Sequence, residues 1–270
     1  MSGDIGLEQP IIFYDEEITE AKKIVLEHKG IKLAYLEINS QKMAGQRGFL
    51  YEGRVFNKLK SKNLIPVGIT PAGADASRPD AVFLYKNVPH NLEVKLDLAT
   101  DYGQGTLEYK DGSWNLGGAQ TPAAEEMRNI LNAVGTVQFT NTSWGYQGAP
   151  NKGTVDNNDI TEEMVREDYR RFKDKFLSVP LSSLFNYYAA KGTYYIQIGG
   201  YGMYYMADNP ANLPVPRFNG AMRLRIRLKR GCSTPIYNYR FTTALQVIQK
   251  PSKSKFNIDE SMNFLVAWMI

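Results

Sequence analysis

Pro79–Asp97 reads PDAVFLYKNVPHNLEVKLD, two short apolar runs joined by turn-forming residues. The runs, Ala81–Tyr85 and Leu92–Leu96, are rich in aliphatic, β-branched and aromatic side chains, whereas Lys86–Asn91 between them contains Asn, Pro and His. Apolar runs separated by such a turn are typical of a β-hairpin. The sequence therefore predicts two antiparallel strands, and we place their loop at Asn87–His90.

The charged residues of this hairpin are expected to share one face. With that loop, position 80 faces position 97, and side chains alternate between the two faces along each strand. One face then carries the charged residues Asp80, Glu93, Lys95 and Asp97. The other carries the apolar residues Leu92, Val94 and Leu96. Two carboxylates can hold a hard divalent cation and a lysine can steady an attacking water, so this face predicts a site for metal-dependent phosphodiester hydrolysis.

The motif Pro79-Asp80 followed by Glu93-Val94-Lys95 resembles the PD-(D/E)xK nuclease superfamily, which includes restriction enzymes, recombination nucleases and phage nucleases. The resemblance covers roughly residues 45–109, a minority of the chain. It implies an α/β (α+β) fold with a restriction-endonuclease-like core, in which a central mixed β-sheet is flanked by helices. It also implies Mg²⁺ as the cofactor, with Mn²⁺ able to substitute, held by Asp80 and Glu93 beside the catalytic Lys95.

An upstream helical glutamate completes the superfamily's pattern, and Glu52 is the candidate for this third metal ligand. Gly48–Lys62 is predicted to be a helix because apolar residues recur there at helical spacing. These residues are Phe49, Val55, Phe56 and Leu59. Glu52 lies on the same face, where a carboxylate is costly unless it is paired or binds a cation. The alternative is a glutamate at the edge of the apolar stripe that reaches solvent.

Two further residues near the motif are candidates. The order of helix, predicted strand Leu64–Ile69 and hairpin matches the superfamily's core. After Lys95, Asp97 is either an additional ligand or a partner for the lysine. Gln104 is similar to a functional glutamine of some relatives, although glycines flank it here whereas those relatives place it on a helix.

Composition bounds the kind of protein. The chain has 270 residues, 43% hydrophobic and 22% charged, which is ordinary for a globular protein. We expect one elaborated domain over residues 1–270, with a catalytic core at about 45–135 and a basic, β-rich C-terminal part at about 192–270. The single cysteine, Cys232, excludes an intrachain disulfide, and the two histidines, His28 and His90, lack the spacing of metal ligands. We expect His90 to lie in an exposed hairpin loop.

Positive charge is concentrated near the C-terminus. The net charge is +4, yet no Asp or Glu occurs from Asn209 to Ile258. Within that stretch, Met222–Lys229 alternates strictly between apolar and basic residues, which predicts a half-buried strand. Its basic face would contact the phosphates of DNA through Arg223, Arg225, Arg227 and Lys229. The alternative is a solvated basic face that protects an edge strand from aggregation.

Other elements follow from periodicity and turn residues. Helices are predicted at Tyr14–Lys29, Pro122–Val134 and Thr161–Phe176. Strands are predicted at Thr193–Met206, as a tyrosine-rich pair around Gly199-Gly200, and at Tyr237–Ile248. Asp101–Gly118 is expected to be a loop or irregular hairpin, and Gly145–Asp159 a mobile loop. Tyr194, Tyr195, Tyr201, Tyr204 and Tyr205 are interpreted as sheet core rather than as a platform for stacking bases.

The N-terminus shows no charged-then-apolar signal sequence, and no apolar run approaches the ~20 residues that cross a bilayer. We therefore expect no membrane association and a cytoplasmic location in a bacterial or phage-infected cell.

The main hypothesis is a Mg²⁺-dependent DNA endonuclease of the restriction type or of a phage or mobile element, and double-strand cleavage would favour a homodimer. A nucleic-acid-binding protein whose Asp80, Glu93 and Lys95 form a structural ion-pair cluster remains the alternative. A nucleotide-handling enzyme of another class ranks last, because no GxxxxGK[ST] loop is present.

Overall fold

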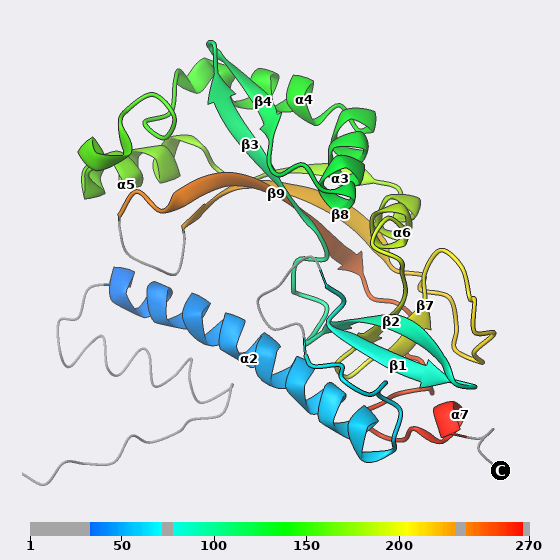
Figure 1. Ribbon diagram of the computed structural model, residues 1–270. Coiled ribbons are helices and arrows are strands. Elements are labelled where there is room, and N and C mark those ends of the chain that lie inside the picture. The colour runs from blue at the N-terminus through cyan, green and yellow to red at the C-terminus, as the bar shows by residue number, and fades with distance from the viewer. Residues whose placement is uncertain (1–32, 72–77, 231–235, 267–270) are drawn as a thin grey trace, which may run out of the picture. The chain divides into compact units, whose positions relative to one another are not determined.

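The structure is a computed structural model that describes residues 33–71, 78–230 and 236–266, with side chains from residue 46 onward (Figure 1). The chain divides into two compact units, Met1–Gly45 and Gln46–Ile270. Of the first unit only residues 33–45 are described, and they are helical. The predicted helix Tyr14–Lys29, His28 and Cys232 lie outside the described residues. All side-chain statements below concern the second unit.

Helices and strands alternate along the described chain. The helices are α2 (Leu33–Ser61), α3 (Pro122–Ala133), α4 (Thr136–Trp144), α5 (Glu162–Arg171), α6 (Leu181–Ala189) and α7 (Asn263–Val266), with 3-10 helices at Gly145–Gln147 and Asn157–Asp159. The strands are β1 (Ala81–Tyr85), β2 (Val88–Lys95), β3 (Gln104–Lys110), β4 (Ser113–Gly117), β5 (Lys175–Val179), β6 (Thr193–Ile198), β7 (Gly202–Tyr205), β8 (Ala221–Arg230) and β9 (Tyr239–Gln249).

The first sheet is mixed and has the order β1-β2-β6-β7. Strand β2 pairs antiparallel with β1 and parallel with β6, as the predicted fold class requires. On one face, Leu92 of β2 packs with Val55 and Leu59 of α2, and on the other, Ile196 of β6 packs with Leu184 of α6. The prediction of an α/β fold with a mixed sheet flanked by helices is confirmed.

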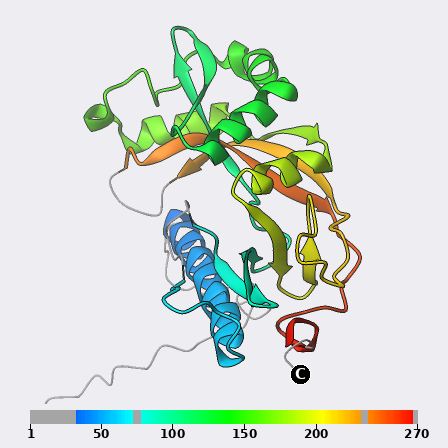
Figure 2. The same ribbon diagram turned by 45° about the vertical axis from the view of Figure 1, so that its right-hand side comes forward.

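The second sheet is antiparallel, with the order β4-β3-β9-β8-β5, and is strongly curved (Figures 1 and 2). Helices α3 and α4 cover one of its faces. Beneath α4, the rings of Trp114, Trp144, Phe172 and Phe241 meet mostly edge to face, with Trp114 and Phe241 4.5 Å apart between centroids. Such contacts add to area burial and fix this layer of the core.

Each sheet combines strands from distant parts of the chain. The hairpin's sheet takes β6 and β7 from residues 193–205, whereas β3 and β4 join the sheet of β8 and β9. The parallel pairing of β2 with β6 requires a crossover. In this chain that crossover runs over residues 96–192 and contains most of the second sheet's supporting helices.

Most predicted elements are confirmed. Pro122–Val134 corresponds to α3, Thr193–Met206 to β6 and β7, Met222–Lys229 to β8, Tyr237–Ile248 to β9, and Asp101–Gly118 contains the β3–β4 hairpin. Helix α5 ends at Arg171, short of Phe176, because β5 begins at Lys175. Helices α4 and α6 were not predicted from the sequence.

The predicted strand Leu64–Ile69 is wrong. These residues form turns instead, because Asn63 and Gly68 adopt positive φ angles of 56° and 83° on either side of Pro66. The segment still supports the hairpin, since the carbonyl of Leu64 accepts a hydrogen bond from the backbone N–H of Leu84 at 2.7 Å.

The hairpin exists, but its predicted loop Asn87–His90 is wrong. Tyr85 pairs with Val88, so the turn consists of Lys86 and Asn87 alone, with φ angles of 51° and 62°. Two positive φ angles match the twist of the flanking strands better than a longer loop. The register is therefore shifted by four residues. Because four is an even number, the residues within the two strands keep their predicted faces, whereas Leu96 and Asp97 lie beyond the end of β2.

The tighter turn moves His90 into β2, so its predicted exposure is also wrong. Its ring lies 5.5 Å from that of Phe83 and 5.9 Å from that of Tyr195, and burial lowers its pKa. Of the tyrosines interpreted as core, Tyr195 and Tyr204 are fully buried, whereas Tyr194, Tyr201 and Tyr205 are half-buried.

No helix within the described parts of the chain combines the length and the apolar character that crossing a membrane requires.

Candidate active site

Helix α2 is fixed against the mixed sheet by apolar and polar contacts. Val55, Phe56 and Leu59 are buried as predicted, but Phe49 is half exposed and Tyr51 takes its place in the core. The Tyr51 hydroxyl donates to Oδ2 of Asp259 at 2.7 Å and accepts from Nε2 of Gln197 at 3.2 Å. These contacts set the rotation of α2, and hence the direction of Glu52.

Asp80 immediately precedes β1 and is held by the opposite strand. Ala81 pairs with Leu92, so the next step of the ladder places Asp80 beside Glu93 rather than beside Asp97. The backbone N–H of Val94 donates to Oδ2 of Asp80 at 2.8 Å. The four-residue correction in register therefore brings the two motif carboxylates together.

Glu93 and Lys95 form a buried ion pair on β2, with Lys95 Nζ 2.5 Å from Glu93 Oε1. Two further residues complete the cluster: the Tyr188 hydroxyl donates to Oε1 of Glu93 at 3.1 Å, and Lys191 Nζ lies 3.5 Å from its Oε2. Glu93 is only 3% exposed, so these partners meet its hydrogen-bonding requirement.

The sequence analysis did not identify Tyr188 and Lys191 as residues of this site. They lie in and just after α6, nearly a hundred residues from Glu93, and no spacing connects them with the motif. The available signal was topological: α6 directly precedes β6, the parallel neighbour of β2, and so must end next to that strand.

A glycine keeps the lysine's strand in place. The N–H of Gly199 donates to the carbonyl of Lys95 at 2.9 Å, and a Cβ at position 199 would lie 2.1 Å from the carbonyl oxygen of Leu96. A larger residue cannot be accommodated without moving the backbone next to Lys95.

The surroundings shift the pKa values of the three carboxylates in different directions. Burial, then the charge of Glu93, raises the pKa of Asp80 to about 6. Burial, then the charge of Asp80, raises the pKa of Glu52 to about 7. The ammonium groups of Lys95 and Lys191 outweigh burial at Glu93 and lower its pKa, while the Glu93 and Asp80 charges raise that of Lys95. The cluster thus combines an ionised Glu93–Lys95 pair with two carboxylates that bind protons readily.

The donor atoms suit a hard divalent cation. Glu52 and Asp80 offer carboxylate oxygens whose mutual repulsion a cation would relieve, and Glu52 makes no hydrogen bond or ion pair with the described residues. No group of three or more His, Cys, Asp or Glu within the described chain is arranged to hold a metal ion. Mg²⁺ usually keeps several waters and needs only one or two protein carboxylates, so the residues present fit this ion.

The additional candidates lie apart from the cluster's contacts. Asp97 Oδ1 accepts the N–H groups of Ala99 and Thr100, which caps a turn, so the carboxylate partner of Lys95 is Glu93 instead. Gln104 begins β3 and bonds to Asp101 and Lys229.

The basic row of β8 exists as predicted, with Met222, Leu224, Ile226 and Leu228 buried and the basic residues on the opposite face. The premise that no acids lie nearby is wrong. Arg225 pairs with Asp174 at 2.6 Å and Arg227 with Asp101 at 2.7 Å, both contributed by distant segments. Arg223 lies over the ring of Phe176, 4.0 Å from its centroid, and donates to Gln246.

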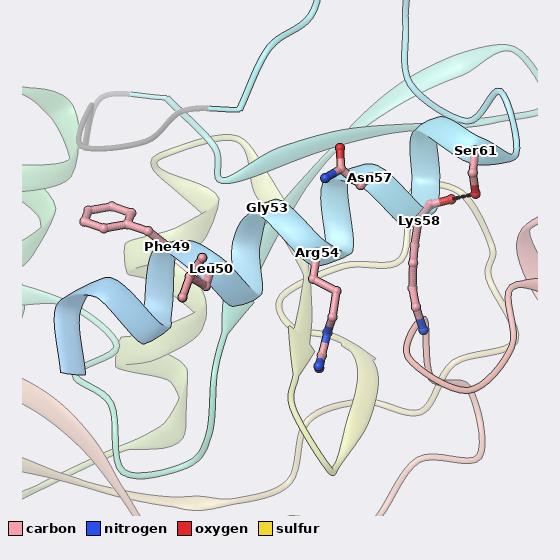
Figure 3. A pocket seen from close by; sticks show the side chains of 7 residues that line it. All are labelled: Phe49, Leu50, Gly53, Arg54, Asn57, Lys58 and Ser61. Atoms are coloured by element: carbon pink, nitrogen blue, oxygen red, sulfur yellow. Dashed lines mark hydrogen bonds between the residues drawn. The ribbon is translucent and has the colours of Figure 1, made fainter. Parts of the chain in front are cut away.

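A shallow hollow of about 580 Å³ lies on the outer face of α2 and includes none of the cluster residues (Figure 3). Arg54 and Lys58 extend from the same side of the helix. Both hold the segment around Asp259: Arg54 pairs with its carboxylate at 3.2 Å, and Lys58 donates to the carbonyls of Ile258 and Asp259. Both cations among the residues that line this hollow therefore stabilise the fold.

Comparison with known proteins gives little. No protein-family model matches the chain, and no curated protein matches it. A solved structure of HhaI endonuclease in complex with DNA is similar at a TM-score of 0.38 and 11% identity, over 74% of this chain and 92% of that chain. A TM-score of this size is too low to support a conclusion about this chain.

Proposed function

We propose that the chain is a Mg²⁺-dependent DNA endonuclease that hydrolyses phosphodiester bonds, with Asp80, Glu93 and Glu52 as metal ligands and Lys95 as a catalytic residue. The observation that carries the proposal is the gathering of these four residues from α2, the start of β1 and the end of β2. Their electrostatic coupling leaves two carboxylates suited to a cation beside a buried, charged lysine.

Lys95 and Glu93 have different roles in the proposed reaction. When bound, Mg²⁺ supplies Lewis-acid polarisation of the scissile phosphate and a lowered pKa for water. Lys95 stays protonated because the Glu93 and Asp80 charges raise its pKa, so it acts as a hydrogen-bond donor and not as a base. Its ammonium group holds the attacking water and offsets negative charge that develops on the phosphate. Glu93 fixes the direction of that ammonium group through their 2.5 Å contact.

Nicking of a supercoiled plasmid tests the proposal. The purified chain should convert supercoiled DNA to the relaxed or linear form with Mg²⁺ or Mn²⁺, and excess EDTA should stop the reaction. Absence of nicking across several unrelated plasmids and both metals would remove the endonuclease assignment. The ratio of relaxed to linear product then separates nicking from double-strand cleavage by a homodimer, which light scattering measures independently.

The second candidate is a non-catalytic nucleic-acid-binding protein. The observation in its favour is the satisfaction of Glu93, whose carboxylate is engaged by two lysines and a tyrosine as in a structural network. DNA binding without cleavage, unaffected by loss of the Glu93–Lys95 pair, would establish this function instead.

Metal and pH should act together on stability. Asp80 and Glu52 have raised pKa values in the folded state, so the folded chain binds protons more tightly than the unfolded chain, and stability without metal should fall as pH rises from about 4 to about 7. Mg²⁺ binds the ionised carboxylates, so it should raise the melting temperature more at pH 8 than at pH 5.5. Calorimetry at constant ionic strength, with NaCl replacing MgCl₂ as the control, measures both effects. Equal Mg²⁺ stabilisation at the two pH values would contradict this linkage.

The basic row of β8 should contribute to DNA affinity and not to sequence choice. Replacing Arg223, Arg225 and Arg227 with Gln should lower the slope of log affinity against log salt by about two to three units, because each phosphate contact contributes about 0.9. Conversely, Asp174→Asn should tighten binding, since Asp174 competes with phosphate for Arg225. Filter binding in EDTA between 50 and 300 mM salt gives the slopes. If the triple variant keeps the wild-type salt slope, the basic face of β8 is solvated and does not contact DNA.

Lys191 should support catalysis through Glu93. Lys191→Ala should reduce cleavage about 10- to 100-fold, as removal of supporting contacts does at other metal sites. It should also move the acidic limb of the pH–rate profile to higher pH, because Glu93 loses a neighbouring positive charge. Lys191→Arg keeps the charge and should retain the wild-type profile. A loss of activity with an unmoved profile would indicate a purely structural role.

A further inference from the structure

A second hollow, of about 420 Å³, lies in the antiparallel sheet where β3 and β9 cease to pair. The ladder between these strands covers only residues 104–107 and 241–244, which leaves a notch beside the end of β3. The notch is lined by Tyr109, Lys110, Lys152, Asn157 and Arg240, among others. None of the proposed cleavage residues lines it.

The loop that closes this hollow is held by a buried carboxylate. Asp168, which is fully buried, accepts the backbone N–H groups of Asn151 and Lys152 at 2.9 and 3.0 Å and the hydroxyl of Tyr239 at 2.9 Å. A charge-assisted anchor of this kind fixes the backbone on both sides of the loop. The backbone position of Lys152 is therefore fixed by its hydrogen bond to the buried Asp168.

Among the residues that the structure describes, the Lys152 ammonium group contacts neutral partners only. Its Nζ donates to Oδ1 of Asn157 at 2.8 Å and to the carbonyl of Tyr237 at 3.0 Å. It also lies over the rings of Tyr237 and Tyr239 at 5.8 and 5.5 Å. Burial and the nearby guanidinium group of Arg240 lower its pKa. An anion in the hollow would remove that repulsion.

Two further cations at the hollow lack partners within the described residues. Lys110 and Arg240 make no side-chain hydrogen bond or ion pair there, and both are exposed. Glu108 is the acid among the lining residues, so three cations face one carboxylate. In this respect the hollow differs from β8, where Asp174 and Asp101 already occupy two arginines.

The hollow continues the basic row of β8. Arg240 on β9 is the cross-strand partner of Lys229, the last of the four basic residues that alternate along β8. A chain of phosphates that followed the row would reach Arg240 next and then the notch. This continuity favours a backbone phosphate over a carboxylate ligand, because only a polyanion would occupy both places at once.

We propose that the hollow formed by Lys110, Lys152 and Arg240 binds a phosphate group of the nucleic-acid backbone, outside the cleavage site. The inference rests on the proposed function in that it takes DNA as the partner. It assigns the hollow an anchoring role: the contact contributes affinity and fixes the direction of the strand, without reading sequence.

The test uses the full chain carrying Arg240→Gln together with Lys110→Gln. Both side chains are exposed and make no hydrogen bond or ion pair with the described residues, so the melting temperature should not change. Binding to a DNA duplex in EDTA is measured against salt concentration. The slope of log affinity against log salt should fall by about two units, at about 0.9 for each lost phosphate contact. A chain carrying Lys253→Gln and Lys255→Gln, which loses equal charge outside the hollow, should show less than half of this change.

Equal slopes in the two double variants would overturn the proposal. So would a competition experiment in which inorganic phosphate protects the hollow from amine modification but DNA does not, since that outcome would identify a site for free phosphate. Failure here is distinguishable from failure of the proposed function. If the wild-type chain nicks plasmid with Mg²⁺ but the Arg240→Gln, Lys110→Gln variant keeps the wild-type salt slope, only the phosphate site in the hollow is rejected. If the wild-type chain neither binds nor nicks DNA, the proposed function and the phosphate site are both rejected.

Discussion

Asp80→Asn is expected to abolish Mg²⁺-dependent nicking and, at the same time, to raise the melting temperature at pH 8. Asparagine is isosteric and can still accept the hydrogen bond from the backbone N–H of Val94. It cannot carry the negative charge that burial and Glu93 make costly at this position, as the raised pKa of Asp80 records. The folded chain therefore loses a repulsion while the proposed site loses a ligand.

The expected magnitudes are large enough to measure. Cleavage should fall at least about a hundredfold, the scale on which loss of one electrostatic contributor affects catalysis. A gain of about 1 kcal/mol in stability would appear as a rise of roughly 2–4 °C for a chain of this size. Both are compared with Asp97→Asn, which changes a nearby carboxylate that caps a turn, and which should leave cleavage within a few-fold of wild type.

The opposite pattern would contradict the assignment. If Asp80→Asn lowered the melting temperature and kept its cleavage, Asp80 would be a structural residue. If Asp97→Asn lost cleavage as completely as Asp80→Asn, the ligand set would need to include the turn. Retained DNA binding by Asp80→Asn in EDTA excludes misfolding as the cause of lost activity.

The sequence correctly predicted which residues share each face of the hairpin, but it did not predict the register of the two strands. Alternation put Asp80, Glu93 and Lys95 on one face, and this survived because the error in the loop was an even number of residues. The two-residue turn at Lys86 and Asn87 was missed because neither residue is glycine, the usual signal for positive φ.

Long-range partners were beyond sequence reasoning for a different reason. Asp101 and Asp174 neutralise the arginines of β8 across 126 and 51 residues, and Lys191 reaches Glu93 across 98. Local composition cannot report such contacts, because they depend on which strands become neighbours. The stretch from Asn209 to Ile258 does lack acidic residues, but acids from other parts of the chain lie beside its arginines in the fold.

The same lesson applies to Glu52. The helical stripe correctly predicted a buried face with Val55, Phe56 and Leu59, but only the fold shows that this face ends beside Asp80. The interpretation of Glu52 as a solvent-reaching edge residue is disfavoured by burial and by the neighbouring charge, which together raise its pKa to about 7.

The Glu93–Lys95 pair offers the second test with a large expected effect, because stability and catalysis should separate in a double-mutant cycle. Glu93→Gln leaves Lys95 and Lys191 without their buried counter-charge, and breaking a buried pair in this way typically costs about 3–5 kcal/mol. Lys95→Met removes the ammonium group but leaves Glu93 paired with Lys191, so its cost should be smaller. Each single change should also eliminate nicking, since one removes a proposed ligand and the other the proposed donor to water.

Combining Glu93→Gln with Lys95→Met should recover much of the lost stability and none of the cleavage. Replacement of both members of a buried ion pair is often nearly neutral, whereas the chemistry needs both groups. Urea denaturation gives the coupling energy, and plasmid nicking gives the activity of the same four proteins. The matched control is the exposed pair of Lys253 and Glu260, 3.7 Å apart, whose coupling should stay below about 1 kcal/mol. A double variant that regained stability together with cleavage would show that the pair only supports the fold, and the chemistry would then have to be assigned to Asp80 and Glu52 alone.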